Sequence, residues 1–168
     1  LRSLGWLLPL ALAGCAGFSA DGGVERVSAL SKERTGYPVK PVNPQAREER
    51  LSQLLSVPLT PDSATEIALL NNKRLQVALA DLGIAEADLV QAGRLRNPGF
   101  SFGRLSSSSD TEFERAILFD LTGLLTMPMR RAIEERRFGQ VQLQTALQAV
   151  RTATDARRAY FQAVASQQ

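Results

Sequence analysis

Cys15 is the only cysteine among the 168 residues, and its surroundings suggest a defined chemistry for its thiol. The chain has no histidine, which excludes a Cys–His catalytic dyad and a Cys/His metal cluster. A single thiol also cannot form an internal disulfide. The residue types therefore exclude most common catalytic and metal chemistry, and we expect no enzymatic activity, no catalytic residue, no metal and no cofactor.

The residues before Cys15 have the pattern of a signal peptide. Arg2 is followed by an apolar run over residues 4–12. This run is much shorter than the about 20 residues that a transmembrane helix needs. It suits the apolar core of a signal peptide, so we predict a signal segment over residues 1–14.

Cys15 ends the stretch Leu12-Ala13-Gly14-Cys15, which resembles the bacterial lipobox. In that motif the thiol is acylated, and small neighbouring residues let a peptidase cut just before the cysteine. Ala16 is not the aspartate that in many bacteria retains a lipoprotein in the inner membrane, so the resemblance implies sorting to the outer membrane. The alternative is an ordinary signal peptide whose apolar core ends near a cysteine.

The next segment, residues 15–59, is predicted to be a lipid-anchored linker. Its prolines favour extended, turn-punctuated backbone, although a short helix is plausible over residues 47–55. Charge gives no sign of a nucleic-acid partner, since 20 basic and 17 acidic residues are spread along the whole chain. The prolines of the linker are Pro38, Pro41, Pro44 and Pro58.

A long helical pattern begins at Thr60, which can cap a helix, with Pro61 suited to the first helical position. Apolar residues recur in steps of four and three as far as Asn97, where Pro98 disfavours helical backbone. Two apolar stripes predict a helix that packs on two sides, although an ordinary helix of a bundle would show the main stripe as well. The main stripe is Ala64, Ala68, Asn71, Leu75, Ala78, Leu82, Ala85, Leu89, Ala92 and Arg96, and the second is Leu70, Val77 and Ile84.

Between this helix and the next, apolar and polar residues alternate with a period of two, which predicts two β-strands joined by a polar turn at residues 106–110. The alternation fits tilted membrane strands with an apolar outer face, and it fits equally a hairpin with one face buried on the helices. The apolar set is Phe100, Phe102, Phe113, Ile117, Phe119 and Leu121, and the opposing acidic set is Glu112, Glu114 and Asp120. These acids have no His or Lys beside them, so a water-facing role suits them better than paired catalytic acids.

A second long helix is predicted from Thr126, a candidate cap, with Pro128 in its first turn. It also carries two neighbouring stripes and therefore two packing sides. The stripe of large residues is Leu143, Leu147, Val150, Thr154, Arg157, Phe161 and Val164, and the stripe of small residues is Ala146, Ala149, Ala153, Ala156, Tyr160 and Ala163.

The order of lipobox, linker, long helix, two strands and long helix resembles the amino-terminal half of a TolC-like outer-membrane efflux protein. The resemblance covers residues 60–168 and rests on loose motifs in a specific order. These motifs are Leu59-Thr60, Ala68-Leu69-Leu70-Asn71-Asn72, Ala85-Glu86-Ala87, Arg96-Asn97-Pro98, Met127-Pro128-Met129-Arg130-Arg131 and Arg158-Ala159-Tyr160-Phe161.

The resemblance implies an α+β membrane protein. Long coiled-coil-like helices would flank a strand pair that forms part of a trimeric outer-membrane β-barrel, continued by a periplasmic α-helical barrel. Residues 60–168 would be the first helix-strand-strand-helix repeat of such a protein, truncated before the second. Asn72 is followed by Lys73 where the family often has proline, which should leave the first helix less interrupted.

The same resemblance implies an outer-membrane channel subunit of a tripartite efflux or secretion system. Its partners would be two further copies in a homotrimer, a periplasmic adaptor protein, an inner-membrane pump and outer-membrane lipid. The apolar strand set would face lipid and the acidic set would face the water-filled lumen. The nearest alternative is a periplasmic adaptor lipoprotein, in which a tight turn joins the two long helices.

Replacing the predicted lipidated residue tests the anchor. Cys15→Ala should release the mature protein from membranes or leave the signal uncleaved, because acyl chains contribute about 0.8 kcal/mol per buried methylene. Metabolic labelling with a radioactive fatty acid measures this directly. Unchanged labelling of the variant would contradict the lipobox interpretation.

Overall fold

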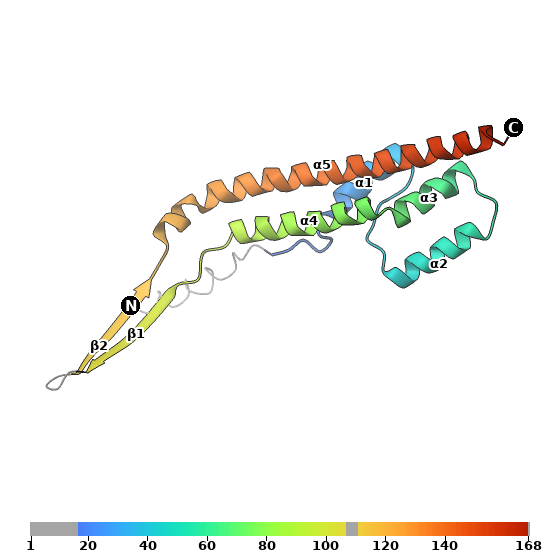
Figure 1. Cartoon of the computed structure of the whole chain (residues 1–168). Helices are drawn as coiled ribbons and strands as arrows, with labels where there is room; N and C mark the ends of the chain where they lie inside the picture. Colours follow the sequence, from blue (N-terminus) through green and yellow to red (C-terminus); the bar gives the residue numbers. More distant parts are fainter. Residues whose placement is uncertain (1–16, 107–110, 168) are drawn as a thin grey trace, which may run out of the picture.

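The structure is a computed structural model that describes residues 17–106 and 111–167, so Cys15 and residues 107–110 of the polar turn lie outside the described residues. The described chain forms five α-helices and a two-stranded antiparallel sheet, arranged as an elongated body with the sheet at one end (Figure 1). In chain order the elements are α1 (Val24–Thr35), α2 (Pro44–Leu55), α3 (Pro61–Asn71), α4 (Lys73–Ala92), β1 (Gly99–Ser106), β2 (Thr111–Leu118) and α5 (Leu121–Ala165).

Helix α5 is the spine of the molecule. It has 45 residues, which at 1.5 Å per residue gives a length of about 68 Å. Helices α3 and α4 lie end to end along it, and α1 also packs against it (Figure 1). Its stripe of small residues faces inward, since Ala146, Ala149 and Ala153 are all buried.

The core forms where those alanines meet larger side chains from α4 and from the segment predicted to be a linker. Leu82 of α4 and Val27 of α1 are both fully enclosed and share one cluster with Ala146. Residues 24–35 therefore form a packed helix, whereas the sequence predicts that they are part of a linker. The short helix predicted over residues 47–55 is confirmed as part of α2.

The first long helix is interrupted at Asn72, where the sequence predicts a less interrupted helix. Asn72 has extended backbone (φ −70°, ψ 111°), and its side-chain oxygen accepts a hydrogen bond from the amide of Leu75 at 3.1 Å, which caps α4. Its side-chain NH₂ donates to Thr152 of α5 at 3.3 Å. The side-chain hydrogen bonds of Asn72 thus take the place of a main-chain helical bond at this point. The helix is therefore interrupted without a proline.

The boundary between the second strand and α5 also differs from the prediction. Strand β2 ends at Leu118, and the carboxylate of Asp120 accepts a hydrogen bond from the amide of Gly123 at 2.7 Å. Asp120 is therefore the N-cap of α5, and Thr126 and Pro128 both lie inside the helix. The chain begins a helix here because the carboxylate oxygen of Asp120 accepts a bond from an amide of the first turn that has no partner within the helix. Continued strand pairing would not satisfy that amide.

The fold class expected from the resemblance, with the strand pair as part of a trimeric outer-membrane barrel, is wrong. The structure is a small α+β arrangement of five helices and a two-stranded antiparallel sheet. The physical reason lies in the segment before Thr60, where α1 packs on α5 and fills one side of the long helices. Within the described ranges, none of the helices combines the length and apolar character needed to cross a membrane.

Two glycines test the packing of α1. Both Gly23 (φ +73°) and Gly36 (φ +83°) have left-handed backbone, but a Cβ on Gly23 would collide with the ring of Phe138, whereas a Cβ on Gly36 would meet nothing. Gly36→Ala should cost about 1–2 kcal/mol of unfolding free energy for the backbone alone. Gly23→Ala should cost about 1–3 kcal/mol more from overpacking. Urea unfolding measures both, and equal losses would show that α1 is not seated on α5 as described.

Candidate functional site: the strand hairpin and its junction with the helices

The hairpin formed by β1 and β2 has two chemically different faces. In the antiparallel register Phe100 is opposite Ile117 and Phe102 is opposite Arg115, so these side chains share one face. We call this the aromatic face. Its members are Phe100, Phe102, Arg104, Ser106, Thr111, Phe113, Arg115 and Ile117.

The opposite face is mostly small or acidic, and we call it the polar face. Glu114 is opposite Gly103 and Glu112 is opposite Leu105. The two glutamates predicted to face water therefore lie on the other side of the hairpin from the phenylalanines predicted to face lipid. Its members are Gly99, Ser101, Gly103, Leu105, Glu112, Glu114, Ala116 and Leu118.

Neither face of the hairpin is covered by the described part of the chain. On the aromatic face Phe100 is 71% exposed and Ile117 is 64% exposed. The alternative prediction, a hairpin with one face buried on the helices, is therefore wrong. Apolar side chains at this density on an uncovered surface are typical of a surface that contacts a partner or a membrane.

Within the aromatic face, contacts between side chains order the outer half of the hairpin. The rings of Phe102 and Phe113 lie with centroids 6.1 Å apart, and the guanidinium of Arg104 lies 5.8 Å from the centroid of Phe113. The second contact has the geometry of a cation–π interaction. It keeps the charge of Arg104 against an aromatic ring.

The other three predicted residues, Phe119, Asp120 and Leu121, lie beyond the strands. Asp120 caps α5, and its Oδ2 is 3.8 Å from Nε of Arg96. It is therefore separated from Glu112, which lies at the far end of β2. The three acids do not form one group, and in the residues that the structure describes no cluster of His, Cys, Asp or Glu could hold a metal ion.

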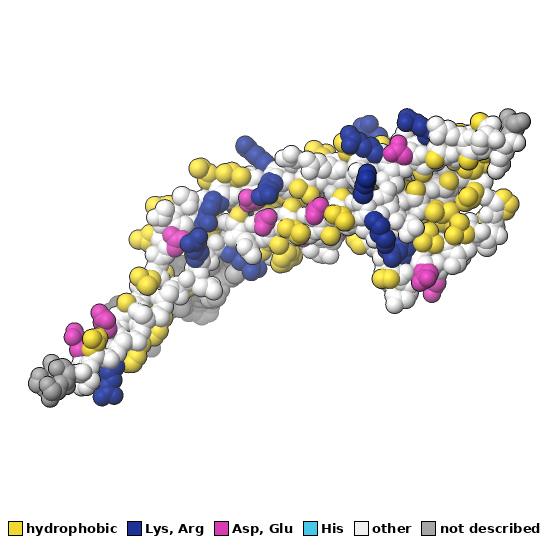
Figure 2. All heavy atoms as spheres, viewed as in Figure 1, with side chains coloured by type: hydrophobic (Ala, Val, Ile, Leu, Met, Phe, Trp, Pro, Cys, Tyr) yellow, Lys and Arg dark blue, Asp and Glu magenta, His cyan; other side chains and the backbone are white. Residues whose placement is uncertain are grey.

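The long helices also leave apolar side chains uncovered on the side away from the core. Val77 and Ile84 of α4 are exposed, as are Leu143, Leu147 and Phe161 of α5. Figure 2 shows hydrophobic side chains scattered along the helical body on the visible face. Two packing sides are predicted for each long helix, and the structure covers only one of them. On α5 the covered side is the alanine side.

Sequence reasoning missed the buried carboxylate of Glu86. Glu86 is only 5% exposed. Its Oε1 accepts a hydrogen bond from the backbone amide of Ser19 at 2.6 Å and another from the Ser19 hydroxyl. Nearby, the side-chain amide of Gln142 donates to the carbonyl of Gly23 at 3.1 Å. Together these bonds fix the start of α1 to both α4 and α5.

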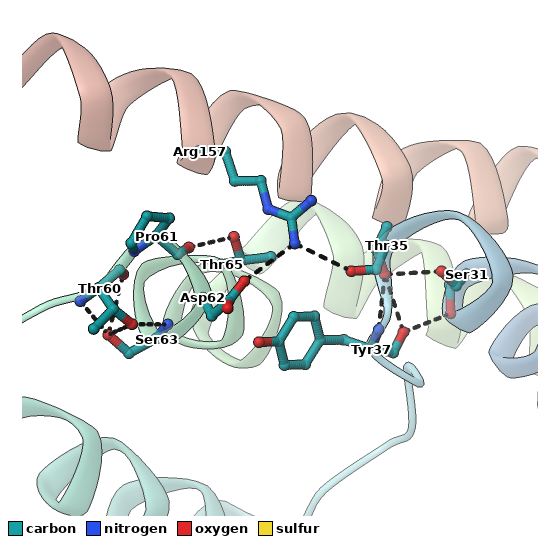
Figure 3. Close-up of polar contacts among 9 residues, drawn as sticks. All are labelled: Ser31, Thr35, Tyr37, Thr60, Pro61, Asp62, Ser63, Thr65 and Arg157. Atoms are coloured by element: carbon teal, nitrogen blue, oxygen red, sulfur yellow. Dashed lines mark hydrogen bonds and ion pairs between the residues drawn. The ribbon is translucent and has the colours of Figure 1, made fainter.

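A second polar cluster joins the far end of α5 to α3 and to the end of α1 (Figure 3). The guanidinium of Arg157 donates to Asp62 Oδ1 at 3.2 Å and to the carbonyl of Thr35 at 3.4 Å. Tyr37 lies beside it, and burial raises the pKa of its phenol, with the negative charges of Asp62 and Glu66 adding to the effect. The guanidinium of Arg157 and the hydroxyls of Ser31 and Thr35 are hydrogen-bonded within the cluster, which is a structural role.

Comparison of the chain with protein-family models, with curated proteins and with solved structures finds no match. The chemistry of the molecule is therefore the basis for a proposed function. Its unusual features are the two exposed faces of the hairpin and the uncovered apolar side of the helices.

Glu86 offers a test of how the start of α1 is held. Glu86→Ala removes the acceptor for the Ser19 amide and should cost about 1–3 kcal/mol of unfolding free energy. Asp81→Ala, at an exposed position of the same helix, is the matched control and should change stability by less than about 0.5 kcal/mol. Limited proteolysis should cut the Glu86→Ala protein before Val27 more rapidly. Equal cleavage of both variants would contradict the role of this bond.

Proposed function

We propose that this chain is a subunit of an outer-membrane channel that gives exported solutes passage from the periplasm to the outside, within a tripartite efflux or secretion system. The observation that carries the proposal is the hairpin. It stands at one end of a long helix pair, and its two chemically different faces are both uncovered.

The strands of the hairpin are slightly shorter than strands that cross a membrane. Each strand has eight residues, which at about 3.3 Å per residue spans about 26 Å. A bilayer core of about 30 Å is crossed by tilted strands of about 9–11 residues. In the proposal the aromatic face contacts lipid and the polar face contacts water.

Two arginines on the aromatic face need a specific place in this arrangement. Arg104 stacks on Phe113 near the turn end of the hairpin, where a long side chain can extend to the lipid headgroups. Arg115 is opposite Phe102, nearer the middle of the strands. In the proposal its apolar stem lies along the aromatic face and its guanidinium reaches towards the nearer membrane surface.

The uncovered side of the long helices supports assembly with neighbouring subunits. Exposed apolar residues follow α4 and α5 on the side away from the core. We propose that these residues contact further copies of the chain in a homotrimer. The helical end would then dock on a periplasmic adaptor protein and an inner-membrane pump, and a lipid on Cys15 would hold the subunit to the outer membrane.

A periplasmic adaptor is the less favoured alternative. In such a protein a tight turn joins the two long helices. Here residues 93–120, which include the whole hairpin, separate α4 from α5. An insertion of that size, uncovered on both faces, has no role in a helical hairpin that only bridges two membrane proteins.

Adjacent positions on the two faces give a matched pair of variants, which are made in the natural full-length protein. Phe102→Arg puts a second guanidinium directly opposite Arg115 on the proposed lipid side, where a charge costs about 2–4 kcal/mol at mid-membrane and the two like charges repel, and it should deplete the protein from the outer-membrane fraction. Ser101→Arg puts the same charge on the polar face and should leave the protein in place. Single-channel recording should then show a lower cation conductance for Ser101→Arg.

Both results are needed. Equal outer-membrane amounts of the two variants would contradict the assignment of the faces. Absence of the unmodified protein from the outer membrane would contradict the proposed function itself.

A further inference from the structure

The junction between the hairpin and the helices contains a cavity of about 630 Å³. It lies between the end of α4, the segment that leads to β1 and the first half of α5. Four arginines line it against two acids, so its lining is positive. Figure 2 shows Lys and Arg side chains on this end of the helical body as well as further along it. The charged lining residues are Arg94, Arg96, Arg130, Arg137, Asp88 and Glu134.

Several of these charges are only loosely paired. Arg137 is 3.7 Å from Glu134, and Arg96 is 3.8 Å from Asp120, both longer than an N–H···O hydrogen bond. Arg130 donates one bond, to the carbonyl of Gly123 at 2.9 Å, while its Nε is buried and has no partner. Arg130 and Arg137 each carry five donors, more than these contacts use, while the cavity has one buried acceptor without a hydrogen bond, Glu134 Oε2.

The rim of the cavity is apolar. Leu95 and Ile133 line it and are both more than half exposed. Met129 and Leu125, one and two turns of α5 nearer the hairpin, are also exposed, and Leu125 is 81% exposed. The arginines are therefore continuous with an uncovered apolar surface that leads towards the strands.

We infer that this junction cavity binds the phosphate of an anionic phospholipid. The planar donors of Arg130 and Arg137 match the paired oxygens of a phosphodiester. The exposed side chains of Leu95, Ile133, Met129 and Leu125 offer the acyl chains a surface that a soluble phosphate compound could not use. The inference rests on the proposed function, which brings this junction to the membrane surface.

The test uses the full-length protein purified in a neutral detergent. Native mass spectrometry counts bound lipids during titration with phosphatidylglycerol, and phosphatidylcholine is the neutral comparison. The double variant Arg130→Gln/Arg137→Gln should weaken phosphatidylglycerol binding by about tenfold or more, because two charge-assisted hydrogen-bond donors are lost. The control is Arg151→Gln/Arg158→Gln, at exposed positions further along the same helix.

Three results would overturn the inference. They are an equal loss in the control, equal binding of the two lipids, or displacement of the lipid by inorganic phosphate at the same concentration, which would mean a site for a free anion. Arg137→Lys keeps the charge but not the paired donors and should give an intermediate loss. It serves in place of the double variant if circular dichroism shows that the latter is unfolded. Binding is measured in detergent, so a negative result would contradict the lipid site alone. The membrane location of the protein is measured separately, by its amount in the outer-membrane fraction.

Discussion

The close contact between the alanine side of α5 and the leucines of α4 is the constraint on which the other elements depend. Short side chains at Ala146 and Ala149 let the two helices approach, and the hydroxyl of Thr145 donates to the carbonyl of Ala78 at 3.2 Å. This bond fixes how far one helix is displaced along the other. Helix α1 and the extended segment after it then pack on the same line, at Leu82 and at Leu75.

Much of the secondary structure could be predicted because its causes are local. Thr60 caps α3 through a bond from the amide of Ser63, as its position before Pro61 suggests, and alternation alone separates Phe102 from Glu114. Helix α1 could not be predicted, since its stability comes from contacts such as that of Val27 with distant helices. Periodicity shows that α5 has two apolar sides, but only the positions of its neighbours decide which side is buried.

The site was predictable to the same limited extent. The two faces of the hairpin follow from the period of two, but a fold class inferred from the order of elements placed the strands in an assembly that the structure does not contain. Glu86 reads as a solvated residue of a helix, because its partner Ser19 is far away in the sequence. Arg130 and Arg96 also belong to different elements, so only the folded chain shows that they share a cavity.

Pro128 gives the molecule a mechanical property. Proline has no amide hydrogen, so one helical bond is absent in the early turns of α5, and Figure 1 shows the helix bending near this end. The fully buried residues of α5 begin only further along, at Gln142, and the partly buried Phe138 and Val141 lie just before it. The hairpin is thus joined to the packed part of α5 through a turn that lacks one helical hydrogen bond, so a change in its inclination would leave the alanine contact intact.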